Sequence, residues 1–465
     1  MSDSPAGALA AELTWTGERF EAGVRLEIRA DGRLARLVRP GGGPTAGSDA
    51  APARPLPRRA LLPGFVNAHS HAFQRGLRGL GETFAAPGGD FWSWRAEMYG
   101  LVGRIDRDRL FDLSLGAFRE MRAAGITSVG EFHYLHHEDP DARDFAFDEV
   151  VLAAAAEAPI RIVLLVACYA AGGPGRPLEG AQRRFAVDTP DELWRQVDRL
   201  GGRLADPSTQ SLGAVAHSLR AVPPEAVAGL RSEARRRGVP LHLHVEEQRR
   251  EIDECVAAYG KRPMELLLGL GAGGEDEPLA GTTAVHCTHT RPEELARFVE
   301  AGGRVCVCPL TEASLGDGIP PLAAALERSP AVAGALCLGT DSNARISMAE
   351  EARWLEYGQR LAGEWRGVLR DRAGRVAPTL LAAATSGGAA ALGLPTGEIA
   401  AGRPADLVAL DLDHPALAGA TPAALLEAFL FGAGDDAIAA TALAGRWSAG
   451  RPGRAVAPAE RTLLA

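Results

Sequence analysis

Two histidines one residue apart, His69 and His71, lie in the largely apolar segment Leu61–Phe73. In an extended strand, residues i and i+2 point to the same side, so both imidazoles can reach one point. Histidine nitrogen is a preferred zinc ligand, bound at about 2.0–2.1 Å. The pair alone fits two surface histidines about as well as a chelate, so its meaning depends on the rest of the chain.

Further candidate ligands occur much later in the sequence, at His244 and Asp341. With His69 and His71 they provide three imidazoles and one carboxylate, which can bind a divalent ion and leave one position open for water. Zinc lowers the pKa of such a water from about 15.7 to about 7, so hydroxide becomes available at neutral pH. These residue types therefore predict metal-dependent hydrolysis.

Glu247 follows His244 by three residues and could protonate a leaving nitrogen, a role typically worth about 10²–10⁴-fold in rate. His286 could orient the hydroxide or stabilise charge on a tetrahedral centre. Periodicity does not choose between His242 and His244, or between His286 and His289. Both pairs stay open at this level.

The elements that would position these side chains are short apolar runs that alternate with amphipathic helical stretches. This alternation is typical of parallel β/α units, and eight such units predict an α/β fold with a (β/α)8 TIM barrel. The predicted strands are Leu61–Ala68, Ile126–Phe132, Ile160–Cys168, Leu212–Ala216, Val239–Val245, Thr282–Cys287, Arg304–Pro309 and Ala335–Thr340.

Polar residues gather where these strands end, which is where barrel enzymes carry their active sites. Ten of the eleven histidines precede residue 290 and end or follow a predicted strand, unlike a random surface distribution. Strand-end residues besides the candidates above are His133, Tyr134, His217, Arg220, Thr311, Glu312 and Ser342.

Both ends of the chain read as short alternating strands with turn residues, including Val24–Arg29, Leu34–Val38 and Ile438–Ala442. A Gly/Pro/Ala-rich linker is expected over Gly41–Pro57. We therefore predict a composite small β-sandwich domain from residues 1–58 and 396–465, and a metal-dependent barrel domain from residues 59–395.

The bulk composition argues against polyanionic partners. The 465 residues carry a net charge of −9 without a cluster of Lys and Arg, so we expect no binding to nucleic acid or to a membrane. We find no leader-like start and no uncharged apolar run of 18 residues, which predicts a cytoplasmic protein. Five of the six cysteines lie in apolar runs and are expected to be buried, reduced thiols.

Four motifs, Pro63–His71, His244–Glu247, His286 and Gly339–Asp341, resemble those of the amidohydrolase superfamily, within its mononuclear deaminase branch. Binuclear members usually carry a carboxylated lysine after the fourth strand, where this chain has His217–Arg220. The resemblance selects His244 over His242. It implies one divalent ion, taken as zinc, held by His69, His71, His244 and Asp341, and proton transfer by Glu247, His286 and Asp341.

Further segments resemble the formimidoylglutamate deiminase family of this branch: Asn67–Arg75, Phe91–Arg95, Glu131–His137, Ala216–Val222 and Trp354–Leu361. This resemblance implies a homodimer that hydrolyses the small anionic substrate N-formimino-L-glutamate to N-formyl-L-glutamate and ammonia in histidine degradation. It also implies that Gln74, Arg95, Tyr134, His217 and Arg220 hold the substrate. Two guanidinium groups suit this substrate, because its two carboxylates accept bidentate hydrogen bonds.

Two other functions share part of this residue set. A purine or triazine deaminase, or a chlorohydrolase, would share the metal ligands and the acid but would not require two substrate-facing arginines. A metal-binding barrel without turnover would not need Glu247, His286 and Asp341 together. Candidate loops to close over a substrate are Gly79–Asp90 and Ala170–Gly180.

Overall fold

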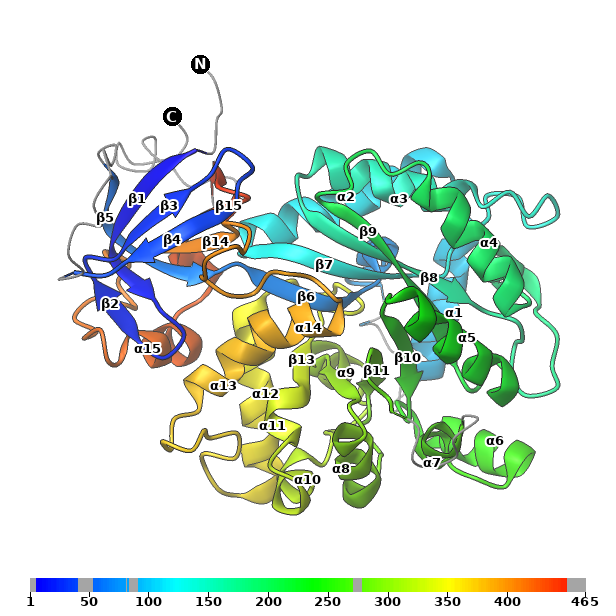
Figure 1. Cartoon of the computed structure of the whole chain (residues 1–465). Helices are drawn as coiled ribbons and strands as arrows, with labels where there is room; N and C mark the ends of the chain where they lie inside the picture. The colour runs from blue at the N-terminus through cyan, green and yellow to red at the C-terminus, as the bar shows by residue number, and fades with distance from the viewer. Residues whose placement is uncertain (1–5, 41–52, 81, 83–90, 271–277, 450–465) are drawn as a thin grey trace.

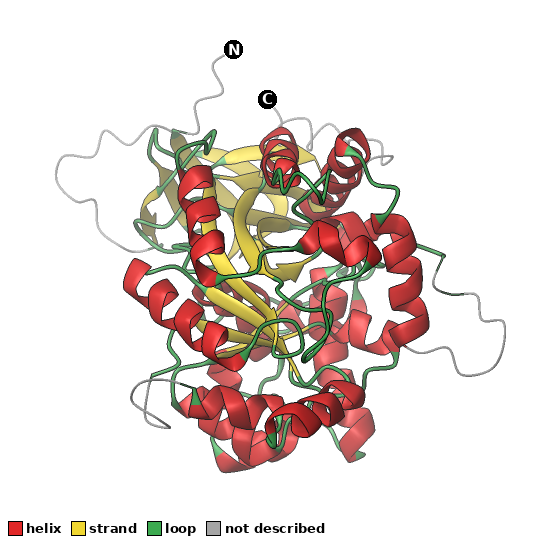
Figure 2. Cartoon of the chain, turned by 90° about the vertical axis from the view of Figure 1, so that its right-hand side faces the viewer, coloured by secondary structure: helices red, strands yellow, loops and turns green. Residues whose placement is uncertain are grey.

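The computed structural model describes residues 6–40, 53–80, 82, 91–270 and 278–449, which form two eight-stranded sheets (Figure 1). One sheet is a parallel barrel and the other combines strands from both ends of the chain. Figure 2 shows helices packed around the barrel strands. In the described part of the chain, no helix combines the length and apolar character needed to cross a membrane.

The barrel strands follow one another in chain order, and every neighbouring pair along the sheet is parallel. This confirms the predicted (β/α)8 fold. Nearly all of their residues are buried, which explains why they read as continuous apolar runs rather than alternating ones. The strands are β6 (Phe65–Ser70), β7 (Ile126–His133), β8 (Arg161–Cys168), β9 (Gln210–Ser218), β10 (Leu241–Val245), β11 (Thr282–His286), β12 (Arg304–Val307) and β13 (Leu336–Leu338).

The barrel closes between its first and last strands through the backbone of three strand-end residues. The Asp341 N–H donates to the His69 carbonyl at 3.0 Å, and the His71 N–H donates to the Asp341 carbonyl at 2.9 Å. Ser70 and Asp341 form the corresponding parallel bridge. The closing seam therefore lies at the carboxyl ends of the strands, among the predicted metal ligands.

Helices connect and cover the strands. Ser347 caps the helix after the eighth strand, because its side chain accepts from the Glu350 N–H at 3.3 Å. The α-helices are α1 (Phe91–Val102), α2 (Arg107–Ala123), α3 (Ala146–Glu157), α4 (Pro190–Gly201), α5 (Pro224–Arg237), α6 (Arg249–Tyr259), α7 (Pro263–Gly269), α8 (Pro292–Glu300), α9 (Pro309–Leu315), α10 (Leu322–Arg328), α11 (Val332–Ala335), α12 (Met348–Gly363), α13 (Ala377–Ala382), α14 (Gly388–Ala391) and α15 (Leu425–Gly432). Shorter turns are η1 (Ala72–Leu77), η2 (Gly180–Phe185), η4 (Ala383–Gly387) and η5 (Asp435–Ala437).

The second sheet joins the two ends of the chain, as predicted. Strands at both of its ends, including Leu34 and Trp447, pack on one hydrophobic cluster, so the sheet folds around a core of its own. A buried ion pair between Arg161 and Asp406, at 3.1 Å, fixes this sheet to the base of the barrel. Its strands are β1 (Gly7–Trp15), β2 (Phe20–Ala22), β3 (Arg25–Ile28), β4 (Leu34–Val38), β5 (Arg54–Pro63), β14 (Leu407–Asp411), β15 (Ile438–Leu443) and β16 (Arg446–Ala449).

The predicted first barrel strand, Leu61–Ala68, was wrong as a single element. Strand β5 ends at Pro63 in the second sheet, and β6 begins the barrel at Phe65. Gly64 separates them, and a Cβ there would lie 2.3 Å from the Thr127 Oγ1, so only glycine fits this approach.

The linker predicted over Gly41–Pro57 was also too long. Residues 54–57 belong to β5, and residues 41–52 lie outside the described part of the chain. Of the two candidate closing loops, Gly79–Asp90 falls largely outside it as well. The other, Ala170–Gly180, is described and is anchored by the Ala170 and Ala171 N–H groups, which both donate to the Ala221 carbonyl.

Candidate active site

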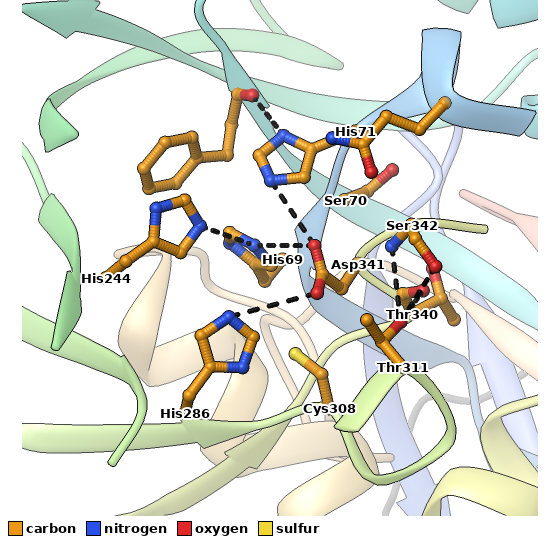
Figure 3. Close-up of polar contacts among 12 residues, drawn as sticks. His69, Ser70, His71, His244, His286, Cys308, Thr311, Thr340, Asp341 and Ser342 are labelled. Carbon is orange, nitrogen blue, oxygen red and sulfur yellow. Dashed lines mark hydrogen bonds and ion pairs between the residues drawn. The ribbon is translucent and has the colours of Figure 1, made fainter. Parts of the chain in front are cut away.

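Four predicted ligand side chains converge at the carboxyl end of the barrel (Figure 3). The Nε2 atoms of His69 and His71 each lie 3.3 Å from the Asp341 Oδ1, and the Nε2 atoms of His69 and His244 are also 3.3 Å apart. Donors that bind zinc tetrahedrally at about 2.0–2.1 Å lie about 3.3–3.4 Å from one another. The donor set and its spacing therefore fit one divalent metal ion.

The backbone selects which imidazole nitrogen faces the centre. Nδ1 of His71 donates to the Phe132 carbonyl at 2.8 Å, and Nδ1 of His244 donates to the His217 carbonyl at 3.0 Å. A ring that donates through Nδ1 presents the lone pair of Nε2 when it is neutral. Burial lowers the pKa of His71 to about 3 and that of His244 well below its usual range, which favours the neutral, metal-binding form.

Asp341 is held as a carboxylate. Burial opposes its charge, but His69, His286 and His71 outweigh this effect and lower its pKa below the usual range. The backbone at Asp341 adopts a left-handed conformation with φ 44°, as does His286 with φ 73°. Such conformations are strained for residues with a Cβ and concentrate at functional sites.

Three polar residues next to the ligands were missed by the sequence analysis as positioning groups. Asn67 donates to the Thr340 Oγ1 at 2.7 Å and accepts from the Thr340 N–H at 3.0 Å. Asn343 accepts from the same hydroxyl and donates to the His71 carbonyl at 3.0 Å. The signal was available, because these asparagines lie within or beside the Pro63–His71 and Gly339–Asp341 motifs.

Glu247 and His286 face the same centre. Nε2 of His286 lies 3.8 Å from the Glu247 Oε1 and 3.8 Å from the Asp341 Oδ2. Burial raises the pKa of Glu247, so this carboxyl can carry a proton nearer neutral pH. Burial alone would lower the pKa of His286, but Glu247, Glu312 and Asp341 together raise it to about 10. The pair can thus hold and move protons beside the ligand cluster.

A pocket opens onto this cluster and is lined by all five predicted substrate contacts. The Gln74 Nε2 donates to the Tyr134 Oη at 2.8 Å, which leaves the buried Gln74 Oε1 without a partner among the described residues. The five contacts are Gln74, Arg95, Tyr134, His217 and Arg220, and the pocket also contains His71, His244, Glu247, His286 and Asp341.

Two guanidinium groups line the pocket. Arg220 is 6% exposed, and within the described residues its Nε and Nη1 have no hydrogen-bond partner. Arg95 donates to the Tyr169 Oη at 3.3 Å. The Cζ atoms of Arg95 and Arg220 lie 5.3 and 5.9 Å from the centroid of the Trp92 ring, whose face attracts cations. The pocket therefore presents positive charge to an anionic ligand.

The remaining strand-end histidines do not join the cluster. Nε2 of His242 donates to the Ala391 carbonyl at 3.0 Å, and His242 does not line the pocket. His289 is half-buried beyond the end of β11. His133 turns away from the pocket that Tyr134 enters, and pairs with the buried Asp148 at 3.0 Å. The structure thus places His244 and His286 in the site, as the resemblance implied.

Comparison with known proteins agrees with this geometry. The chain matches the amidohydrolase family over residues 60–448. It is 40% identical to a formimidoylglutamate deiminase of Pseudomonas aeruginosa over 95% of this chain and 94% of the relative. It is 30% identical to an 8-oxoguanine deaminase of the same organism, over 84% and 82% of the two chains.

A solved structure of an amidohydrolase from Brucella melitensis superposes with a TM-score of 0.84 at 32% identity, covering 98% of both chains. The match to the family spans the barrel and the C-terminal strands β14, β15 and β16 of the second sheet, and the ligand cluster lies where barrel enzymes place their sites. The chain therefore belongs to the amidohydrolase family.

Proposed function

We propose that the protein is a formimidoylglutamate deiminase that hydrolyses N-formimino-L-glutamate to N-formyl-L-glutamate and ammonia in histidine degradation. The observation that carries the proposal is the pocket that joins the ligand cluster to Arg95 and Arg220. Two buried or half-buried guanidinium groups suit a substrate with two carboxylates. The 40% identity to a deiminase of this name supports the same substrate.

We propose zinc as the resident ion, held by His69, His71, His244 and Asp341. Three neutral imidazoles and one carboxylate at tetrahedral spacing are typical of zinc sites. When bound, such an ion polarises the substrate and lowers the pKa of a water molecule to about 7. A homodimer and a cytoplasmic location stay predictions from the sequence and its resemblance.

The chain's own residues would then bind the substrate and move protons. Arg95 and Arg220 hold the carboxylates, while Gln74, Tyr134 and His217 line the path to the ligand cluster. The unpartnered Gln74 Oε1 can accept a hydrogen bond from a substrate N–H group. These contacts would fix the formimino carbon beside Glu247, His286 and Asp341.

The proposed proton transfers balance the reaction. The Asp341 Oδ2, assisted by His286, accepts a proton from the attacking water as its oxygen bonds to the formimino carbon. Glu247 protonates the imine nitrogen. The proton that Asp341 took from water is then delivered to the same nitrogen, and Glu247 regains a proton from the new C–OH group as the carbon–nitrogen bond breaks. Ammonia leaves, and the carbonyl oxygen that came from water stays on the glutamate as the N-formyl group.

An ammonia-release assay on purified protein tests the proposal, together with metal analysis that distinguishes zinc from iron. N-formimino-L-glutamate should yield one ammonia and one N-formyl-L-glutamate per turnover, while guanine and 8-oxoguanine should yield none. Release of formamide would contradict the chemistry, and turnover of a purine alone would contradict the substrate. Bound metal without ammonia from any of these would favour a non-catalytic barrel.

A further inference from the structure

Glu312, in helix α9, contacts the Nδ1 side of the proposed catalytic histidine, His286. It is 3% exposed, and its Oε1 lies 3.2 Å from the His286 Nδ1. The opposite nitrogen, Nε2, is the one that lies 3.8 Å from both Glu247 and Asp341. His286 is thus held on one side by a carboxylate that the proposed reaction does not use.

The direction of this hydrogen bond follows from a second donor. The Cys308 N–H donates to the same Glu312 Oε1 at 3.0 Å, and a backbone N–H can only donate. Because this oxygen already serves as an acceptor, we assign the proton of the Glu312–His286 bond to Nδ1. Nε2 is then the nitrogen that exchanges a proton with groups in the pocket.

Other contacts leave the orientation of the ring open. His286 stacks on His244 with the ring centroids 5.5 Å apart and the planes at 15°. Parallel stacking keeps the plane of the ring but permits a half-turn about the Cβ–Cγ bond, which exchanges Nδ1 with Cδ2 and Nε2 with Cε1. Among the described ion pairs of Glu312, His286 is the only partner, so this carboxylate is available to hold the ring.

We propose that Glu312 is a positioning residue that fixes the His286 ring with Nδ1 protonated and Nε2 directed at Glu247 and Asp341. Its effect on turnover rests on the proposed deiminase function, whereas the orientation of the ring does not. Sequence analysis placed Glu312 at the end of the seventh barrel strand and gave it no role.

Kinetics of three variants test the role. Glu312→Ala should lower kcat by about 10–100-fold, with KM within about threefold of the wild type, because substrate binding groups are untouched. Glu312→Gln should restore kcat to within about tenfold, since an amide oxygen can accept from Nδ1. The control is Glu351→Ala, which removes another buried carboxylate. Glu351 lies in α12 and accepts from the Leu310 N–H of α9, but among the described ion pairs it has none with His286.

A loss in Glu312→Ala no larger than in Glu351→Ala at equal metal content, or a change in KM alone, would overturn the positioning role. A spectroscopic arm does not depend on turnover. In zinc-loaded protein with ¹⁵N-labelled histidine, long-range proton–nitrogen spectra should show the His286 Nδ1 protonated, assigned by the signal lost in His286→Asn. An unprotonated Nδ1 would refute the assignment even if the protein turned over another substrate.

Discussion

Replacing Arg220 with methionine should weaken substrate binding without destabilising the fold. In the wild type, the Arg220 Nε and Nη1 have no partner among the described residues, although the side chain is 6% exposed. A buried hydrogen-bonded charge pair with a substrate carboxylate is worth about 2–5 kcal/mol on truncation of one partner. Since 1.36 kcal/mol is tenfold in rate, Arg220→Met should lower kcat/KM by roughly 30- to 5,000-fold.

The same substitution should stabilise the substrate-free protein. An unpaired buried guanidinium is unfavourable, and methionine fills similar volume without a charge, so the free energy of unfolding should rise by about 1–2 kcal/mol. Activity and stability would then move in opposite directions, as they do where a binding site stores an unsatisfied group.

Steady-state ammonia release and denaturant unfolding measure the two effects. Two substrate analogues, each lacking one of the two carboxylates, show which carboxylate Arg220 binds. The wild type should discriminate against the analogue missing the Arg220 partner, and Arg220→Met should not. A matched control is Arg161→Met, which removes a buried guanidinium paired with Asp406 at the base of the barrel.

The control should lose about 3–5 kcal/mol of stability, because Asp406 is left buried and uncompensated, while the activity of the folded protein is kept. The reasoning would be refuted if Arg220→Met kept kcat/KM within threefold of the wild type. It would also be refuted if both arginine variants lost stability alike, since Arg220 would then have a structural partner.

Three further outcomes are expected. Trp92→Leu should raise KM by about 2- to 30-fold with kcat unchanged, because the ring that attracts Arg95 and Arg220 is removed; a fall in kcat alone would contradict this. Removing the bound metal by chelation should lower the free energy of unfolding by about 4 kcal/mol when free metal had been at 1,000 times Kd, as followed by thermal unfolding. Asp148→Asn should destabilise the protein by about 3–5 kcal/mol at pH 7, since Asp148 pairs with His133 and His136 at 3.0 and 2.9 Å in a buried cluster. Burial alone would raise the pKa of Asp148, but His136 and His133 lower it, so this deficit should be full above pH about 4 and shrink as the pH falls below it; an unchanged deficit in acid unfolding would count against a charged Asp148 held by these hydrogen bonds.

The proposed ligand set could be predicted because its four members lie at the ends of three parallel strands, β6, β10 and β13. Position along the sequence then translates directly into position around the barrel mouth, and His69, His71, His244 and Asp341 needed no knowledge of loop geometry. The same logic placed Arg220 and Tyr134 in the pocket. Residues two apart share one face of a strand, so the strand pattern could not settle whether His242 or His244 reaches the proposed metal site. The family resemblance supplied that choice.

Other features depended on information that a strand pattern does not carry. The run Leu61–Ala68 is apolar except for Asn67 because both sheets bury it, so hydrophobicity could not reveal that the chain changes sheets at Gly64. His133 and Tyr134 were both expected at the pocket, yet successive residues of a strand point to opposite sides, and His133 went to the Asp148 cluster. Glu312 reaches His286 only because α9 begins directly after β12.

The barrel seam ties the site to the kinetics of unfolding. The first and last barrel strands meet through the backbones of His69, His71 and Asp341, whose side chains are the proposed metal ligands. An ion bound there would cross-link the first and last barrel strands and oppose their separation during unfolding. Rates of unfolding and of proteolytic cleavage should therefore rise with the rate of metal dissociation, and variants that exchange metal faster should be shorter-lived proteins.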